Sequence, residues 1–311
     1  MLHVTNGDIV VGSLAASGLA GDRLGWVDVL HEGPVRGGIS DEQLCAERAA
    51  FLAEADGRAY EDVFAPLEQR DRRLAEAAGR DEIVLWFEAD LYDQLQLIQI
   101  LDRLEPHGVE LICIHDHPSV ERFYGLGQLE AHVFPELFEE RVPVTAEQTA
   151  LARRAWAAFR ERSPESLDAL RREEPAALPY LAAALTRLLE ELPWTTDGLS
   201  RTERSLLAAL ADAPATSADA FRAYLESEER PFLGDTWAFD RLAGLAANGR
   251  PLLEETAGGR YVLTHDGERV LASEVDALEL RGIDRWLGGT HIGRPDPVWR
   301  WDPDRARAVL G

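Results

Sequence analysis

Lysine is absent from this 311-residue sequence, so all 32 of its basic residues are arginine. A pyridoxal phosphate Schiff base, a P-loop nucleoside triphosphatase and the usual protein-kinase site each depend on a lysine, and all three are therefore excluded. Positive charge is also scarce overall, because the formal net charge is −24. Binding to nucleic-acid phosphates takes dense Lys and Arg contacts, which an acidic chain supplies poorly.

Cysteine is scarce in the sequence, and long apolar runs are absent. Cys45 and Cys113 are the only cysteines, which argues against a disulfide framework and against a thiolate zinc site. The apolar runs are far shorter than the roughly 20 residues of a membrane helix. Residues 1–5 have neither the basic stretch nor the apolar core of a signal peptide. We therefore expect a cytoplasmic protein without a membrane partner.

Apolar runs of strand length alternate with helical patterns in the first half of the chain. Hydrophobic residues make up 46% of the sequence, enough for two ordinary domains. The patterns predict strands over 2–5, 26–30, 83–87 and 109–114, and helices over 9–17, 40–79 and 91–104. Continuous apolar strands separated by helices are typical of a parallel sheet covered on both faces. The sequence thus predicts a Rossmann-like open α/β domain over residues 1–143.

The strand pattern stops after residue 143. Helical patterns over 145–162, 165–173 and 177–191 predict a helical connector over residues 144–192. Residues 199–311 then follow the order of a winged helix, with three helices, a hairpin turning at Gly258-Gly259 and a further helix. The glycine-rich tail after residue 281 lies outside that pattern. We expect it either to bring His291 to the first domain or to pack between the domains.

Each predicted strand of the first domain is followed by polar or ionisable side chains. Ligands of open α/β sheets bind beyond the carboxyl ends of the strands, where the strand order reverses. We therefore expect the four strand ends to form one pocket. The candidate catalytic residues are Asp8, His31, Glu88, Asp90 and His115. The candidate ligand-binding residues are Asn6, Gly7, Glu32, Tyr92, Gln94 and His291.

Each of these groups also has a purely structural interpretation. Asn6-Gly7 offers backbone N–H groups to an anion, or forms a tight turn in which Asp8 caps the next helix. His31 is a candidate general base or part of a solvated turn. Glu88 and Asp90 suit a divalent cation or separate acid and base roles, or else cap the helix that follows.

Metal binding is a further possibility at the fourth strand end. His115 and His117 would lie on one side of an extended segment, and this spacing would allow both side chains to bind one zinc or iron ion. The alternative is two loop histidines before Pro118. Cys113 lies within the predicted strand and is interpreted as a core thiol. A divalent metal is thus the one cofactor that the sequence suggests, and its identity is left open.

Three segments resemble the bacterial "domain of unknown function 1835" family: Leu2-His3-Val4-Thr5-Asn6-Gly7-Asp8, Asp28-Val29-Leu30-His31-Glu32-Gly33-Pro34 and Leu85-Trp86-Phe87-Glu88-Ala89-Asp90-Leu91-Tyr92-Asp93-Gln94-Leu95. The tail from Ile283 to His291 is similar to that family's C-terminal region. The resemblance implies the α/β fold but no activity. The family pattern often has serine at Ile9 and histidine at Ala89, so an activity that uses those side chains would be altered or lost here.

Two classes of function are compatible with these features. The first is an enzyme that acts on a small polar or phosphorylated substrate by acid/base or metal-assisted chemistry. The second is a ligand-sensing regulator, or a scaffold, that uses the winged-helix-like domain for contacts with DNA or protein. The expected partner is a small molecule, DNA is disfavoured, and a homodimer is left open.

We predict no meaningful binding to duplex DNA at physiological salt. Residues 200–273 hold 12 Asp and Glu against 8 Arg, a net charge of −4, and nonspecific affinity for DNA is largely electrostatic. Fluorescence anisotropy with a labelled duplex tests this expectation. Submicromolar binding that weakens steeply with added salt would overturn it.

Overall fold

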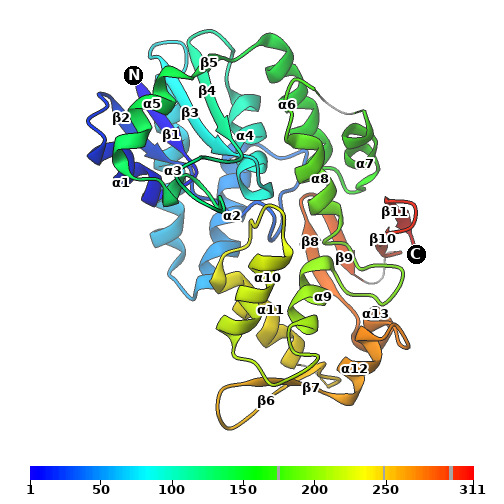
Figure 1. The fold of residues 1–311 in the computed structure, drawn as a ribbon. Helices are drawn as coiled ribbons and strands as arrows, with labels where there is room; N and C mark the ends of the chain where they lie inside the picture. The colour runs from blue at the N-terminus through cyan, green and yellow to red at the C-terminus, as the bar shows by residue number, and fades with distance from the viewer. Residues whose placement is uncertain (174–175, 248, 294–296) are drawn as a thin grey trace. The chain divides into compact units, whose positions relative to one another are not determined.

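The chain divides into two units in the computed structural model, which describes residues 1–173, 176–247, 249–293 and 297–311 (Figure 1). The first unit is Met1–Leu185 with Gly288–Thr290, and the second is Thr186–Leu287 with His291–Gly311. The boundary expected at residue 143 falls inside the first unit. The reason is that helix α6 (Ala146–Phe159) packs along helix α4 (Leu91–Arg103) and completes the first core.

A five-stranded, mostly parallel sheet forms the centre of the first unit and makes it a mixed α/β structure. The strand order is β2-β1-β3-β4-β5, and β5 alone is antiparallel. The strands are β1 (Leu2–Thr5), β2 (Asp22–Gly25), β3 (Ile83–Glu88), β4 (Val109–Ile114) and β5 (Val142–Pro143). The predictions for β1, β3 and β4 agree with these bounds. The apolar run of β3 is buried on both faces, as expected for a central strand of a parallel sheet.

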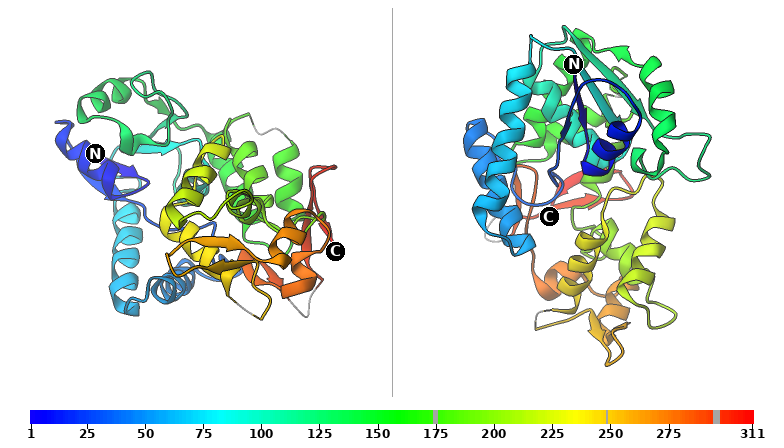
Figure 2. Two further views of the ribbon diagram at one scale, coloured as in Figure 1. Left: turned by 60° about the horizontal axis from the view of Figure 1, so that its bottom comes forward. Right: turned by 90° about the vertical axis from the view of Figure 1, so that its left-hand side faces the viewer.

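Helices cover both faces of this sheet (Figures 1 and 2). The connection from β1 to β2 through α1 (Asp8–Ala16) runs across the sheet in the opposite direction to that from β3 to β4 through α4. Because such parallel crossovers are right-handed, α1 and α4 lie on opposite faces. The strand order therefore reverses between β1 and β3.

The α1 face of the sheet buries a continuous apolar core. Val84 and Trp86 of β3 pack there against Leu14 of α1 and Phe134 of helix α5 (Phe134–Glu139). The indole N–H of Trp86 donates to Nδ1 of His3 at 3.1 Å, which satisfies a buried polar group of each side chain. Two short 3-10 turns, η1 (Leu126–Gln128) and η2 (Ala131–Val133), complete this layer.

The second predicted strand is the main error in the sequence-based fold. Strand β2 lies at Asp22–Gly25, and the apolar run over 26–30 that follows it is irregular. Its backbone carbonyls are satisfied by helix side chains instead of a neighbouring strand: Gln96 donates to the carbonyl of Asp28 at 3.0 Å, and Arg70 to that of Val27 at 3.2 Å. Such long-range partners remove the need for a sheet ladder.

The long helical region predicted after the irregular segment is divided in two by a helix C-cap. The predicted helix over 40–79 is two helices, α2 (Asp41–Asp56) and α3 (Tyr60–Ala77), because Gly57 ends the first in a left-handed conformation. Capping boxes at Ser40 and Thr145 start α2 and α6. Helix α7 (Glu165–Arg172) and helix α8 (Leu181–Leu189) complete the helical stretch. No helix among the described residues is long and apolar enough to cross a bilayer.

The second unit contains several short helices and hairpins. The elements are α9 (Arg201–Ala208), α10 (Ser217–Ser227), α11 (Asp235–Ala246), β6 (Leu253–Glu255), β7 (Tyr261–Leu263), α12 (His265–Leu271), α13 (Ala277–Arg281), β8 (Asp284–Leu287), β9 (Thr290–Gly293), β10 (Trp299–Asp302) and β11 (Arg307–Leu310). Strands β6 and β7 pair as an antiparallel hairpin. Buried Arg187 holds the helical part together through ion pairs of 2.6 Å to Glu191 and to Glu228.

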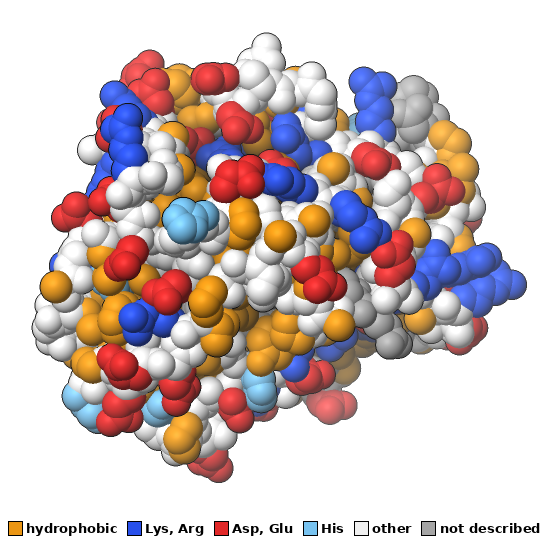
Figure 3. All heavy atoms as spheres, turned by 90° about the horizontal axis from the view of Figure 1, so that it is seen from above, with side chains coloured by type: hydrophobic (Ala, Val, Ile, Leu, Met, Phe, Trp, Pro, Cys, Tyr) orange, Lys and Arg blue, Asp and Glu red, His pale blue; other side chains and the backbone are white. Residues whose placement is uncertain are grey.

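Charged side chains are mixed on the surface. On the face drawn in Figure 3, red acidic side chains lie among blue side chains, all of which are arginines in this chain. Apolar side chains are scattered between them on the same face. This mixture is typical of a solvated surface.

Three residues of the tail join the first unit. The carbonyl of Gly288 accepts the N–H of Val35 at 2.8 Å, and the N–H of Gly289 donates to the carbonyl of Phe159 at 2.9 Å. Gly288 has a φ of +59°, and a Cβ atom there would overlap the Phe159 carbonyl oxygen. Glycine is therefore required at this point by both the backbone conformation and the close approach.

We predict that Gly288→Ala destabilises the protein more than Gly57→Ala. Both glycines have left-handed backbones, which cost alanine about 1–2 kcal/mol, but Gly57 has open space around it. Overlap with Phe159 should add about 1–3 kcal/mol for Gly288→Ala. Urea denaturation of the two variants measures the difference. Equal losses would mean that the tail does not pack against α6.

Candidate functional site

The candidate site lies where the sheet reverses its strand order, at the carboxyl ends of β1 and β3. Asn6 directly follows β1, and Glu88 is the last residue of β3. Asp90 is the N-cap of α4, where its carboxylate accepts the N–H of Asp93 at 3.1 Å. Because β1 and β3 are hydrogen-bonded neighbours in parallel register, their ends meet at one edge. The strand order thus brings Asn6 to these carboxyl groups.

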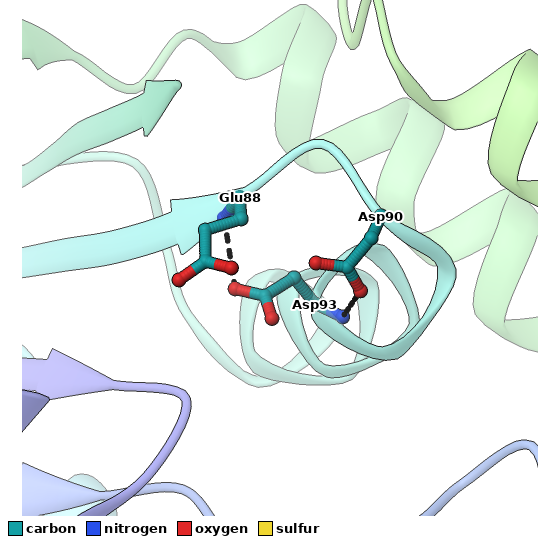
Figure 4. A group of neighbouring side chains, drawn as sticks. All are labelled: Glu88, Asp90 and Asp93. Atoms are coloured by element: carbon teal, nitrogen blue, oxygen red, sulfur yellow. Dashed lines mark hydrogen bonds between the residues drawn. The ribbon is translucent and has the colours of Figure 1, made fainter. Parts of the chain in front are cut away.

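Three carboxyl groups share this edge. Glu88, Asp90 and Asp93 each offer an oxygen that lies within 4.8 Å of the other two, and all three residues are buried (Figure 4). The Asn6 side chain donates one N–H to Glu88 at 3.0 Å and the other to Asp93 at 2.9 Å. We call Asn6, Glu88, Asp90 and Asp93 the carboxyl cluster.

Backbone N–H groups complete the hydrogen bonding of the cluster. The N–H of Leu126 donates to Glu88 at 2.6 Å, and the N–H of Glu88 donates to Asp93 at 2.8 Å. Gly125, with a φ of +150°, precedes this turn, and a Cβ atom there would overlap the Glu88 carboxyl group. A glycine is needed because the backbone has to approach Glu88 so closely.

Burial raises the pKa of all three carboxyl groups. Burial, reinforced by the charge of Asp90, raises the pKa of Glu88 to about 8. Burial also raises the pKa of Asp90 to about 6, although the backbone N–H groups at the start of α4 oppose this effect. The pKa of Asp93 lies well above its usual range, through burial and the charges of Glu88 and Asp90. At neutral pH Glu88 therefore holds the proton of this pair.

Further predicted residues surround the cluster. The hydroxyl of Tyr92 donates to the carbonyl of Asn6 at 3.3 Å, and its ring meets the ring of His31 edge to face at 6.1 Å. Gln94 donates to the carbonyl of Glu88 at 2.7 Å. Cys113 lies 3.6 Å from the same carbonyl, and burial raises the pKa of its thiol to about 12, so it is not a thiolate nucleophile at neutral pH.

The first two strand ends bring only some of their predicted residues to the cluster. Gly7 is the N-cap of α1 and Asp8 its first residue, so Asp8 does not have the capping role considered for it. Its exposed carboxylate faces Gly25 at the end of β2. The carbonyl of Glu32 accepts from Arg48 at 2.7 Å.

The predicted histidines other than His31 have different neighbours. His115 is exposed, with its ring 5.4 Å from that of Tyr180 and a nitrogen 3.5 Å from Asp116. His117 hydrogen-bonds Ser119 at 2.7 Å. His291 belongs to the second unit, where it hydrogen-bonds Asp284 at 2.8 Å.

The side chains that are close enough together to hold a metal ion are those of the carboxyl cluster. Within the described parts of the chain, Glu88, Asp90 and Asp93 form the one group of three or more His, Cys, Asp or Glu side chains close enough to share an ion. His115 and His117 therefore do not belong to such a group. Three carboxylate oxygens suit a hard cation such as Mg²⁺ or Mn²⁺ better than the zinc or iron expected from histidines.

No protein-family model matches the chain, and no curated protein matches its sequence. The interpretation of the site therefore depends on its own geometry.

Asp93, Gly125 and Leu126 were not among the site residues predicted from the sequence. Asp93 lies one turn into α4, among residues with an apolar pattern, and its carboxylate faces inward. A carboxylate three residues after an N-cap was the available signal. The approach of Gly125 and Leu126 had no such signal, because it depends on a contact 38 residues away along the chain.

We predict that the stability of the protein falls as pH rises from about 5 to 8. Glu88 has a raised pKa in the folded state, so the folded protein holds a proton that the unfolded chain releases from near pH 4.5 upward. The loss is on the order of 1.4 kcal/mol per pKa unit. Glu88→Gln should flatten the slope without abolishing it, because Asp90 and Asp93 titrate in the same direction.

Denaturant midpoints between pH 5 and 9 measure this slope. Glu61→Gln, which changes an exposed residue of α3, is the matched control and should keep the wild-type slope. Parallel slopes for wild type and Glu88→Gln would mean that Glu88 titrates normally.

Proposed function

We propose that the protein is an enzyme that acts on a small polar substrate by acid/base chemistry at the carboxyl cluster. The observation that carries this proposal is the Glu88–Asp90 pair, whose buried carboxyl groups have oxygens within 4.8 Å of one another and pKa values of about 8 and about 6. Neighbouring carboxyl groups whose environments separate their pKa values are a recurrent basis of acid and base roles in enzymes.

The two carboxyl groups take different roles at neutral pH. Glu88 is protonated and serves as the general acid, while Asp90 is ionised and accepts a proton from the substrate. Asn6 holds Glu88 and Asp93 in place through its two amide hydrogens. Asn6 and Tyr92 are only partly buried, so they mark the side from which a substrate approaches.

The start of α1 supports a substrate that carries an oxyanion or a phosphate group. Among the described residues, no side chain caps the N-terminus of α1, because its N-cap is Gly7. A helix N-terminus presents free N–H groups and a positive partial charge to such a group. Asp8 lies in the same turn and opposes a highly charged substrate, which favours a polar molecule with one anionic group.

The fold supports a site at this place. We propose that the first unit is Rossmann-like, since its four parallel strands lie in the order β2-β1-β3-β4 and the order in which the chain adds strands reverses between β1 and β3. Ligands of such sheets bind at this reversal. We also propose membership of the "domain of unknown function 1835" family, on the sequence segments that include Asn6, His31 and Glu88.

Metal-assisted chemistry is the second use that this cluster supports. The oxygens of Glu88, Asp90 and Asp93 lie close enough to hold one Mg²⁺ or Mn²⁺ ion. Binding would displace the Glu88 proton, so affinity should rise with pH. Activity that is lost with EDTA and restored by Mg²⁺ would assign the metal role, whereas activity indifferent to EDTA supports the acid/base pair.

A regulator remains the alternative function, and its support is the order of elements in the second unit. Helices α9, α10 and α11, the β6–β7 hairpin and α12 follow one another as in a winged helix. The net charge of −4 over residues 200–273 favours contacts with protein over DNA. We therefore propose a winged-helix-like unit for protein contacts as the second candidate.

We predict that wild-type protein consumes at least one compound from a mixture of sugars, sugar phosphates, nucleotides and amino acids. Glu88→Gln should slow that consumption by about 10²–10⁴-fold, the usual contribution of a general acid. Asp90→Asn should slow it similarly, and Glu61→Gln should match wild type. Mass spectrometry of the mixture over time measures the depletion.

The pH profile provides a second readout in the same assay. Consumption should be bell-shaped, with limbs near pH 6 and pH 8 that belong to the pair. A compound that Glu88→Gln and wild type consume at the same rate would contradict the proposed roles.

A further inference from the structure

Residues 26–35 form an irregular segment whose backbone carbonyls accept hydrogen bonds from helix side chains. This segment carries His31, whose buried ring contacts Tyr92 beside the carboxyl cluster. We propose that Arg48 of α2 is the positioning residue that sets His31 against Tyr92. A part for His31 in the reaction rests on the proposed function, but the geometry itself is tested independently of any reaction.

Arg48 contacts both ends of the turn that contains His31. Its guanidinium group forms an ion pair with Asp28, in which Nη2 and Nε donate to Oδ1 at 2.8 Å and 3.1 Å. It also donates to the carbonyls of Val29 at 2.9 Å, Glu32 at 2.7 Å and Pro34 at 3.2 Å. One side chain therefore fixes the residues on both sides of His31.

The chemistry of this contact requires an arginine. Arg48 is 1% exposed, and burial of a charge is costly unless it is paired and its donors are satisfied. The planar guanidinium has five N–H donors in a fixed fork, which here meet one carboxylate and three backbone carbonyls. Lysine keeps the charge but cannot reach these acceptors in the same geometry.

The position of His31 is transmitted to the cluster through Tyr92. The Tyr92 ring meets the His31 ring edge to face, with an interplanar angle of 71°, and its hydroxyl donates to the carbonyl of Asn6. Asn6 in turn donates to Glu88 and Asp93. A displaced turn would therefore move the ring that supports Asn6.

Arg70 of α3 is a matched control. It is 6% exposed, pairs with Asp71 at 2.8 Å and stacks on Trp26 with its guanidinium carbon 4.0 Å from the ring centre. It donates to the carbonyl of Val27 and so holds the start of the same segment. Loss of Arg70 should destabilise the fold without moving His31.

The test is the ring Cε1–H signal of His31 in carbon–proton correlation spectra of the full-length protein. The chain has eight histidines, and His31→Gln identifies the signal by its disappearance. Tyr92→Leu removes the neighbouring ring and defines the direction of the shift that follows loss of this contact. Arg48→Gln should shift the signal in that direction, and Arg48→Lys should lie between wild type and Arg48→Gln.

Arg70→Gln should leave the His31 signal at its wild-type position while it lowers the melting temperature. A folded Arg48→Gln protein with an unmoved His31 signal would overturn the proposal, as would an equal shift in Arg70→Gln. If Arg48→Gln does not fold, Arg48→Lys decides in the same way. Because these signals need no substrate, failure of the proposed function would leave this result intact, and the reverse also holds.

Discussion

The site depends on the side-chain amide of Asn6, which donates hydrogen bonds to two buried carboxyl groups. One is Glu88 at the end of β3, and the other is Asp93 in α4. Glu88 and Asp93 repel one another when ionised, and burial makes each charge more costly. Asn6 and the N–H groups of Leu126 and Glu88 offset part of that cost by donating to their oxygens. Protonation of Glu88 removes much of the remaining cost of burying these charges. A protein gains no stability from such an arrangement, and functional sites are where these arrangements recur.

Local sequence patterns predicted most strands of the sheet correctly. They also predicted a strand in the segment after β2, which is irregular. Strand β3 begins as a continuous apolar run and β4 is mainly apolar, and such runs between turn residues identify strands of a parallel sheet. The run over 26–30 looks the same, yet it forms an irregular segment. Its carbonyls are satisfied by Arg48, Arg70 and Gln96. These partners lie 19 to 68 residues further along the chain, beyond the reach of any local pattern.

The site was partly predictable for a geometric reason. Parallel neighbouring strands bring their carboxyl ends to one edge, so Asn6 and Glu88 could be expected to meet. His115 also follows a neighbouring strand, but it lies in an exposed loop with Asp116 and Tyr180 as its neighbours. The position of a residue at a strand end is thus set by the strand order, whereas the direction of a loop side chain depends on what packs around it.

The protonation state of Glu88 at neutral pH is the most direct test of the account. Infrared difference spectra between wild type and Glu88→Gln separate a protonated carboxylic acid from a carboxylate through their different C–O stretching bands. A wild-type protein at pH 7 should show the carbonyl band of a buried carboxylic acid, lost in Glu88→Gln and replaced by carboxylate bands above about pH 8. Carboxylate bands for Glu88 already at pH 6, without added divalent cation, would contradict a protonated Glu88 at this edge of the sheet.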